Sequence, residues 1–244
     1  MKTTMAVLAV LGVVAAACGG GGDDGPAYEP AKADAIAHAA LLSPVDLPGS
    51  GWVIASRDQF PDSERLDAAV DSAACTSAEA KSKAAKDAAA ADRAGRARLE
   101  LTLAAKGSVQ ISTTIDHTVS IQNTEEATDR AMEAFRALAA SDDMGKCLGE
   151  VVSKGLGSAP GSKVTATTVK AAGSVPNGGA ASAFDIAITI QNQTLEMRVE
   201  SYVWQDGNAG VTVAITGQKD QVTADVVKKA LDTANAKLKA QQGD

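Results

Sequence analysis

The sequence predicts an α+β fold: one antiparallel sheet, or two, with amphipathic helices packed on one face. Two observations lead to this class. Several stretches alternate between apolar and polar residues, which is typical of half-buried strands, and others repeat apolar residues at helical spacing. Twice along the chain, strands of the first kind are followed by one amphipathic helix. We therefore expect two similar strand-then-helix halves, without a sequence repeat.

The first half is predicted to contain helices at residues 31–42, 77–97, 123–141 and about 147–156, and strands at residues 98–103 and 109–122. Alternation defines the two strands, which we expect to pair as a hairpin. The helix at 77–97 has no large apolar residue, so we interpret it as exposed. The helix at 123–141 begins at a cap, Asn123, and carries Phe135 and Leu138 on one stripe.

The second half is predicted to contain strands at residues 164–170, 184–190, 195–203 and 211–215, and then a helix at residues 221–240. Asp206-Gly207 is the strongest hairpin signal of the chain and joins the last two strands. The final helix carries Val227, Leu231 and Leu238 on one stripe.

Length and charge narrow the class of protein. The chain has 244 residues, enough for one domain or two small ones, and 23 Lys and Arg against 30 Asp and Glu give a net charge of −7. A general nucleic-acid binder needs a basic face, so we expect no nucleic-acid partner. The chain has two histidines, and we expect no metal site and no cofactor.

Residues 1–17 have the features of a signal peptide. Lys2 precedes an uncharged stretch, Met5 to Ala17, that is shorter than the ~20 residues of a membrane-spanning helix. The alanines that lead into Cys18 resemble the lipobox of bacterial lipoproteins, in which the cysteine receives diacylglycerol and becomes the mature N-terminus. The resemblance implies that Cys18 is the lipidation site. The alternative is a cleaved, soluble secretory protein in which Cys18 has no role.

This interpretation divides the chain into a signal peptide, 1–17, a lipidated cysteine with a flexible Gly/Asp tether, 18–30, and a single extracytoplasmic domain, 31–244. Within the domain, Cys75 and Cys147 remain. Two cysteines in an oxidising compartment most simply form one disulfide, worth on the order of 4 kcal/mol in the chain-entropy model. Two buried thiols or a reactive pair are the alternatives.

Two stretches carry a family resemblance: Leu41–Trp52, LLSPVDLPGSGW, and the strand-helix-cysteine block Val119–Leu148. Both resemble uncharacterised secreted lipoproteins of actinobacteria. More distantly, roughly residues 36–239 are similar to the extracellular sensor domain of a mycobacterial serine/threonine kinase. The resemblance implies a surface-exposed α+β module without known catalysis.

Motifs that carry catalysis are missing from the sequence. GxSxG, SxxK, GxxxxGK[ST], HExxH and the EF-hand loop do not occur. His117 lies on the apolar face of its predicted strand, and Asp116 points to the opposite face. A catalytic histidine needs an orienting carboxylate and a nucleophile, so we interpret His117 as a partly buried structural residue. We expect that the protein is not an enzyme.

Tyr202 and Trp204 are the candidate binding residues. If Met197, Val199 and Val203 face the core, the two aromatic residues share the opposite face with Arg198. Trp, Tyr and Arg dominate binding hot spots, so the three are predicted to form a binding surface. The alternative is that a helix, the alanine-rich segment or the Trp52 loop covers them, because large exposed apolar patches are uncommon on monomers.

The preferred hypothesis is a non-catalytic, sensor-like module that is lipid-anchored to the cell membrane on its extracytoplasmic face. It would bind a protein, a cell-wall component or a lipid. The alternative is an envelope lipid carrier, which requires an apolar cavity well above ~300 Å³.

Overall fold

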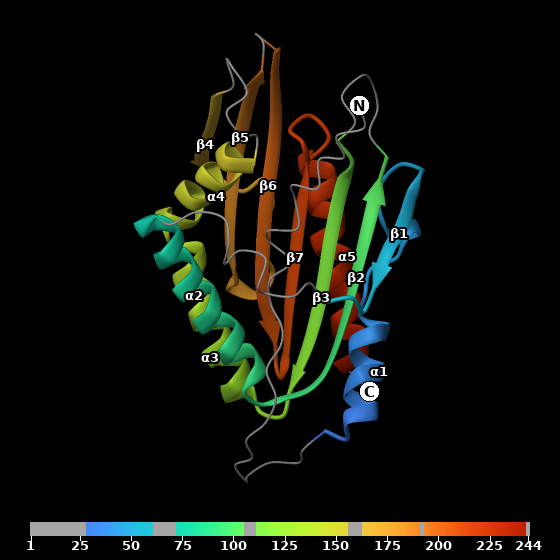
Figure 1. Cartoon of the computed structure of the whole chain (residues 1–244). Coiled ribbons are helices and arrows are strands. Elements are labelled where there is room, and N and C mark those ends of the chain that lie inside the picture. The colour runs from blue at the N-terminus through green and yellow to red at the C-terminus, as the bar shows by residue number, and fades with distance from the viewer. Residues whose placement is uncertain (1–27, 61–71, 105–110, 156–162, 191–192, 243–244) are drawn as a thin grey trace.

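The computed structural model describes residues 28–60, 72–104, 111–155, 163–190 and 193–242 (Figure 1). In these residues seven antiparallel strands form one sheet in the order β1-β2-β3-β7-β6-β5-β4. The strands are β1 Trp52–Arg57, β2 Arg93–Leu103, β3 Thr113–Gln122, β4 Lys163–Val169, β5 Ala180–Ile190, β6 Gln193–Asp206 and β7 Ala209–Gln218. The α-helices are α1 Pro30–Ala39, α2 Ala73–Ala90, α3 Glu125–Ala139, α4 Asp142–Gly155 and α5 Ala224–Gln242.

The two halves of the chain join at the centre of the sheet. Strand β3 pairs with β2 on one side, as the predicted hairpin requires, and with β7 on the other. In this register His117 lies between Leu99 and Val213. The predicted hairpin at Asp206-Gly207 is confirmed, since Asp206 pairs with Ala209 and Gly207 has a φ of 50°. The described strands therefore form one sheet, and the predicted α+β class is confirmed.

Helices cover both faces of this sheet, whereas the sequence led us to expect them on one. Figure 1 shows α5 behind the sheet and α2, α3 and α4 in front of it. We call the side covered by α1 and α5 the α5 face, and the side covered by α2, α3 and α4 the α3 face. The physical reason is that β6 is apolar on both sides. Val199 packs towards α4, whereas Tyr202, on the opposite side of the same strand, packs towards α5.

The larger hydrophobic core lies on the α5 face. It joins residues of β2, β3, β6 and β7 to one stripe of α5, and its largest fully buried members are Leu99, Leu101, Ile115, Ile121, Tyr202, Trp204, Ile215 and Leu231. The α3 face has smaller clusters. Helix α4 lies over β4, and its Leu148 packs in a cluster with Phe184 of β5. Helix α3 packs through Met132 and Phe135.

Helix α2 differs from its prediction. It is capped by Ser72 and ends at Ala90, and residues 93–97, expected to be helical, begin strand β2. Nor is it simply exposed, because Ala78, Ala85 and Ala89 are buried. Such small side chains allow the helix backbones to approach closely. In this way α2 packs against α3 and α4 without a stripe of large residues.

No helix in the described part of the chain has the length and apolarity needed to cross a membrane. The predicted signal peptide, Cys18 and most of the tether lie outside the described residues.

Candidate functional site

The predicted disulfide between Cys75 and Cys147 is confirmed. Its sulfurs are 2.10 Å apart, and it connects α2 to α4 with a Cα–Cα distance of 4.5 Å. Both cysteines are buried in a small cluster with Ala78. The bond therefore holds two helices of the α3 face together across 72 residues of sequence.

The structure places Tyr202 and Trp204 in the core, and the expectation that they lie outside it is wrong. Both side chains are 0% exposed, and they pack in the cluster of the α5 face. The Tyr202 hydroxyl accepts the N–H of Gly173 at 3.0 Å and donates to the carboxylate of Glu200. A covering helix was the alternative explanation, and here α5 supplies it. The pair consequently presents no surface for stacking.

Arg198, the third predicted binding residue, belongs to an ion-pair cluster instead. Its guanidinium holds Asp185 through Nε–Oδ1 and Nη2–Oδ2 contacts of 2.7 and 3.1 Å, and Lys219 reaches the same carboxylate at 2.9 Å. Burial opposes the charged form of Asp185, but the hydrogen bonds from Arg198 and Lys219 lower its pKa. Arg198 is thus occupied by residues of its own sheet.

His117 is a buried structural residue, as the sequence indicated. Its Nδ1 accepts the backbone N–H of Leu42 at 3.0 Å, which ties the segment after α1 to the central strand. Burial, reinforced by the charge of Lys237, lowers the pKa of His117 to about 3. The imidazole is therefore neutral at physiological pH, and the side chain is fully buried.

The α3 face carries a pocket that is lined in part by polar side chains. Strand β3 presents a polar row there, Asp116, Thr118, Ser120 and Gln122, because its odd-numbered residues fill the core of the other face. Between this row and α3 lies a partly open pocket of about 20 Å³. Its lining comprises Ala89, Thr118, Ser120, Gln122, Thr128, Ala131, Met132, Phe135, Val203, Gly210, Val211 and Thr212.

The register of β3 and β7 creates this hollow. Thr118 pairs with Thr212, so two hydroxyl side chains stand next to each other, and Ser120 pairs with Gly210. A Cβ added at Gly210 would meet nothing closer than 3.9 Å. Because Gly210 has no side chain, space remains between α3 and strands β3 and β7.

Gln122 closes one end of the pocket. It is 2% exposed, and its Nε2 donates to the carbonyl of Ala89 at 2.7 Å, which fixes the orientation of the amide. Its Oε1 is buried and accepts no hydrogen bond from the described residues. A buried carbonyl oxygen without a donor costs roughly 1–3 kcal/mol.

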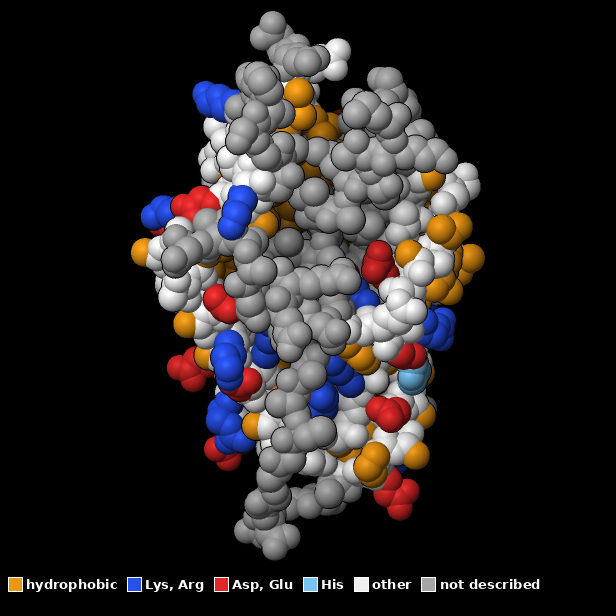
Figure 2. All heavy atoms as spheres, in the orientation of Figure 1, with side chains coloured by type: hydrophobic (Ala, Val, Ile, Leu, Met, Phe, Trp, Pro, Cys, Tyr) orange, Lys and Arg blue, Asp and Glu red, His pale blue; other side chains and the backbone are white. Residues whose placement is uncertain are grey.

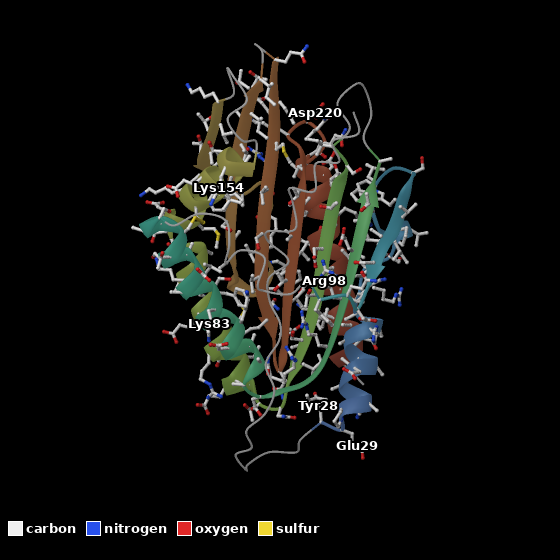
Figure 3. All side chains as sticks on the ribbon, in the orientation of Figure 1. Tyr28, Glu29, Lys83, Arg98, Lys154 and Asp220 are labelled. Atoms are coloured by element: carbon white, nitrogen blue, oxygen red, sulfur yellow. A yellow bond between two sulfur atoms is a disulfide. The ribbon has the colours of Figure 1, made fainter. Side chains whose placement is uncertain are left out.

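The polar row is closed towards its other end, where Arg98 binds Asp116. The Arg98 Nε lies 3.0 and 2.9 Å from the two carboxylate oxygens, and Nη1 donates to the carbonyl of Gln59. Figure 3 shows Arg98 near the middle of the sheet. Burial raises the pKa of Asp116 and the hydrogen bonds from Arg98 lower it, with burial the larger effect. This ion pair is buried and serves the packing of the sheet.

The outer surface around the pocket carries charges of both signs. Figure 2 views the α3 face and shows basic and acidic side chains interspersed over α2 and α3. Two helical ion pairs account for part of this pattern, Lys83–Asp87 and Arg130–Glu126.

Sequence reasoning missed the pocket residues because polar positions opposite an apolar row are usually solvated. The available signal was the stripe on the helix at 123–141, with Phe135 and Leu138, since an amphipathic helix needs a surface to cover. That surface is the polar side of β3 and the Val203 side of β6.

No protein-family model matches the chain, and no curated protein matches it. Two solved structures from Mycobacterium tuberculosis are similar to it. The extracellular domain of PknH is 14% identical, with a TM-score of 0.42 over 87% of this chain and 97% of that domain. LpqN, described as involved in cell envelope biogenesis, is 8% identical, with a TM-score of 0.23 over 57% of this chain and 67% of its own. The distant resemblance to a mycobacterial kinase domain is thereby confirmed, at low identity.

Proposed function

We propose that this protein is an exported, lipid-anchored and non-catalytic module that binds a ligand or partner at the extracytoplasmic face of the cell membrane. The Cys75–Cys147 disulfide is the observation that carries the proposal. Disulfides persist in oxidising compartments and are rare in the cytosol. A buried disulfide between two helices of the fold therefore supports a protein that folds after export.

Cys18 is the proposed point of attachment to the membrane. Support comes from the sequence: the short apolar segment before it, the alanines that lead into it, and the Gly/Asp stretch that follows. An attached diacylglycerol would hold the domain at the membrane surface through the tether.

The enclosure of the buried titratable side chains favours binding over catalysis. His117 is neutral and fully enclosed, and the buried Glu200 is held by the N–H of Ala172 and the hydroxyl of Tyr202. Neither group faces the pocket on the α3 face, whose described lining is uncharged. This pocket, with a volume of about 20 Å³, does not have room for an acyl chain.

Metabolic labelling with a radioactive fatty acid tests the anchor. The full chain expressed in an actinobacterial host is expected to incorporate label and to partition with membranes. Cys18→Ala should lose the label and the membrane association, whereas the matched variant Cys75→Ala should keep the label. Label in Cys18→Ala, or none in the parent chain, would contradict the proposal.

Native mass spectrometry of the exported protein tests the binding class. A protein mass without acyl lipid beyond the Cys18 modification is expected. A copurified acyl lipid in the folded domain would favour the lipid carrier instead.

A further inference from the structure

We infer that strand β1 pairs, at its outer edge, with β1 of a second copy of this chain, which makes the protein a two-fold symmetric dimer with one continuous sheet. This association goes beyond the proposed function, because it does not depend on an anchor at Cys18. We call the surface formed by Val45, Val53, Ile54 and the outward backbone groups of β1 the β1 edge.

The exposed large apolar side chains of the described residues gather at the β1 edge. Val45 is 90% exposed, Val53 57% and Ile54 47%. Val53 and Ile54 belong to β1, and Val45 belongs to the 3₁₀ helix η1, Pro44–Asp46, which contacts β1. Figure 2 shows a hydrophobic patch at the margin of the molecule where β1 lies. Apolar groups that are exposed side by side mark a surface for interaction.

The backbone of β1 decides what kind of partner fits. Among the described strands β1 pairs with β2 alone, and Figure 1 shows it at the margin of the sheet. In a strand with one neighbour, alternate residues point their N–H and C=O groups away from the sheet. A lipid bilayer could cover the apolar side chains, but its hydrocarbon offers no partner to these backbone groups. An extended strand satisfies both.

The opposite edge of the sheet is protected against such pairing. Strand β4 exposes Lys163, Thr165, Thr167 and Thr168, and the exposed large apolar residues of the described chain lie elsewhere. A lysine and polar side chains are typical of an edge strand that does not pair. A contact between β1 of one copy and β4 of the next would also run head to tail without closing. We therefore assign β1 of the second copy as the partner.

Two-fold antiparallel pairing centred on Ile54 suits the sequence of β1. Ile54 then lies opposite Ile54 of the second copy, and Val53 lies opposite its Ala55. Arg57, the charged residue of β1, lies beside Gly51 of the second copy, so like charges do not meet. Parallel pairing would instead place one Arg57 against the other. A two-fold contact closes after two copies, which predicts a dimer.

Sedimentation velocity of the exported full chain, in detergent micelles matched in density to the solvent, tests the inference. Because β1 has only six residues, we expect a reversible equilibrium in which the particle grows from one chain to two as the protein concentration rises. Ile54→Lys should weaken dimerisation by about tenfold or more, since like charges would face each other and apolar contact is lost. Thr167→Lys, at an exposed site on β4, is the matched control and should leave dimerisation unchanged.

A cysteine cross-link tests the register. Residues directly opposite each other in an antiparallel pair have Cα atoms about 4.5–5.5 Å apart, which a disulfide can span. Oxidation with copper phenanthroline should therefore link two chains of the variant Ile54→Cys, and a reductant should separate them again. Thr167→Cys is the matched control and should stay a single chain.

A particle of one chain at every concentration would overturn the inference. A dimer that Ile54→Lys leaves intact, or equal cross-linking of Ile54→Cys and Thr167→Cys, would do the same. Docking of the β1 edge on a membrane would also overturn it, through a monomer that binds phosphatidylcholine vesicles and loses this binding in Ile54→Lys. Fatty-acid labelling reports on Cys18 alone, so failure of the proposed function and failure of this inference are distinguishable.

Discussion

The two faces of the sheet differ in how they are filled, although the same strands build both. On the α5 face, β3 contributes Ile115 and Val119 to a core that also encloses Trp204. On the α3 face, the same strand contributes Thr118 and Ser120, and the covering helices are joined by a disulfide. The comparison indicates that one face supplies most of the hydrophobic stabilisation, which leaves the other free to carry polar groups and a pocket.

The helices repeat this difference. Helix α5 packs Leu231 and Leu238 against the sheet, whereas α2 contacts its neighbouring helices through alanines and a cysteine. Small side chains bury little apolar area, so the α3 face gains less from the hydrophobic effect. A covalent bond between α2 and α4 offsets part of this deficit.

The largest effect is expected at Trp204, the largest fully buried side chain of the α5 face. Trp204→Ala should lower the free energy of unfolding by about 3–5 kcal/mol, because it removes a large apolar group and leaves a cavity. Urea unfolding followed by circular dichroism measures the loss. Ala137→Gly, at an exposed site on α3, provides a surface control and should cost about 1 kcal/mol. If both variants lost a similar free energy of unfolding, the α5 face would not be the main source of hydrophobic stabilisation.

Removal of the disulfide should have the next largest effect, and it should act on the α3 face. The double variant Cys75→Ala, Cys147→Ala is expected to lose about 2–4 kcal/mol of stability. Hydrogen exchange should show faster opening in α2 and α4 than in α5. Uniformly faster exchange would mean that the two faces unfold as one unit. Intact mass with and without reductant, which should differ by two hydrogens, confirms the bond in the parent protein.

His117 is expected to make the stability of the α5 face depend on pH. Its pKa is about 3 in the folded chain, against 6.5 for the ordinary side chain. Between these values the unfolded chain binds a proton that the folded chain does not. The free energy of unfolding should therefore fall by up to ~1.4 kcal/mol per pH unit as the pH decreases from about 6 towards 3.

The variant His117→Gln isolates this contribution, since other groups also titrate in the same range. The free energy of unfolding of the parent and of the variant is measured by urea unfolding at each pH. The difference between the two should change with pH by the expected slope. Parallel stability curves for the two proteins would exclude His117 as its source.

Glycine substitutions should show the smallest effects and a clear contrast between the faces. A Cβ at Gly95 would lie 2.5 Å from the backbone of Ala33 in α1, so Gly95→Ala should cost about 1–3 kcal/mol through overpacking. Gly210 has room for a Cβ, and Gly210→Ala should stay within about 1 kcal/mol of the parent because it also restricts the unfolded chain. Thermal unfolding of both variants measures the contrast. Similar losses would mean that the α3 face is packed as tightly as the α5 face.

Much of the fold could be predicted from local patterns. The alternation around Leu99 and His117 correctly indicated a hairpin, and Asp206-Gly207 correctly indicated a tight turn. The start of β2 was missed because the residues from Arg93 to Ala97 continue an alanine-rich stretch with good helix formers. Pairing with β3 decides their conformation, and pairing is a long-range interaction.

The candidate site was predicted less well. The disulfide was expected from cysteine count and compartment, but the binding residues were assigned to the wrong environment. Tyr202 and Trp204 alternate with Val199 and Val203, and alternation shows only that the two sets lie on opposite sides. It cannot show that helices cover both, which buries Tyr202 and Trp204 and leaves Gln122 beside a pocket.

The sequence by itself determined the alternation of the strands, the stripes of the helices, the tight turn and the two cysteines available for a disulfide, because these depend on neighbouring residues and on composition. Only the tertiary structure decided which face each helix covers, that the halves share one sheet through β3 and β7, and that a polar row meets Met132 and Phe135 across a pocket. The physical reason is that apolar rows on both sides of a strand each need a cover, and the choice of cover depends on contacts between residues far apart in the chain.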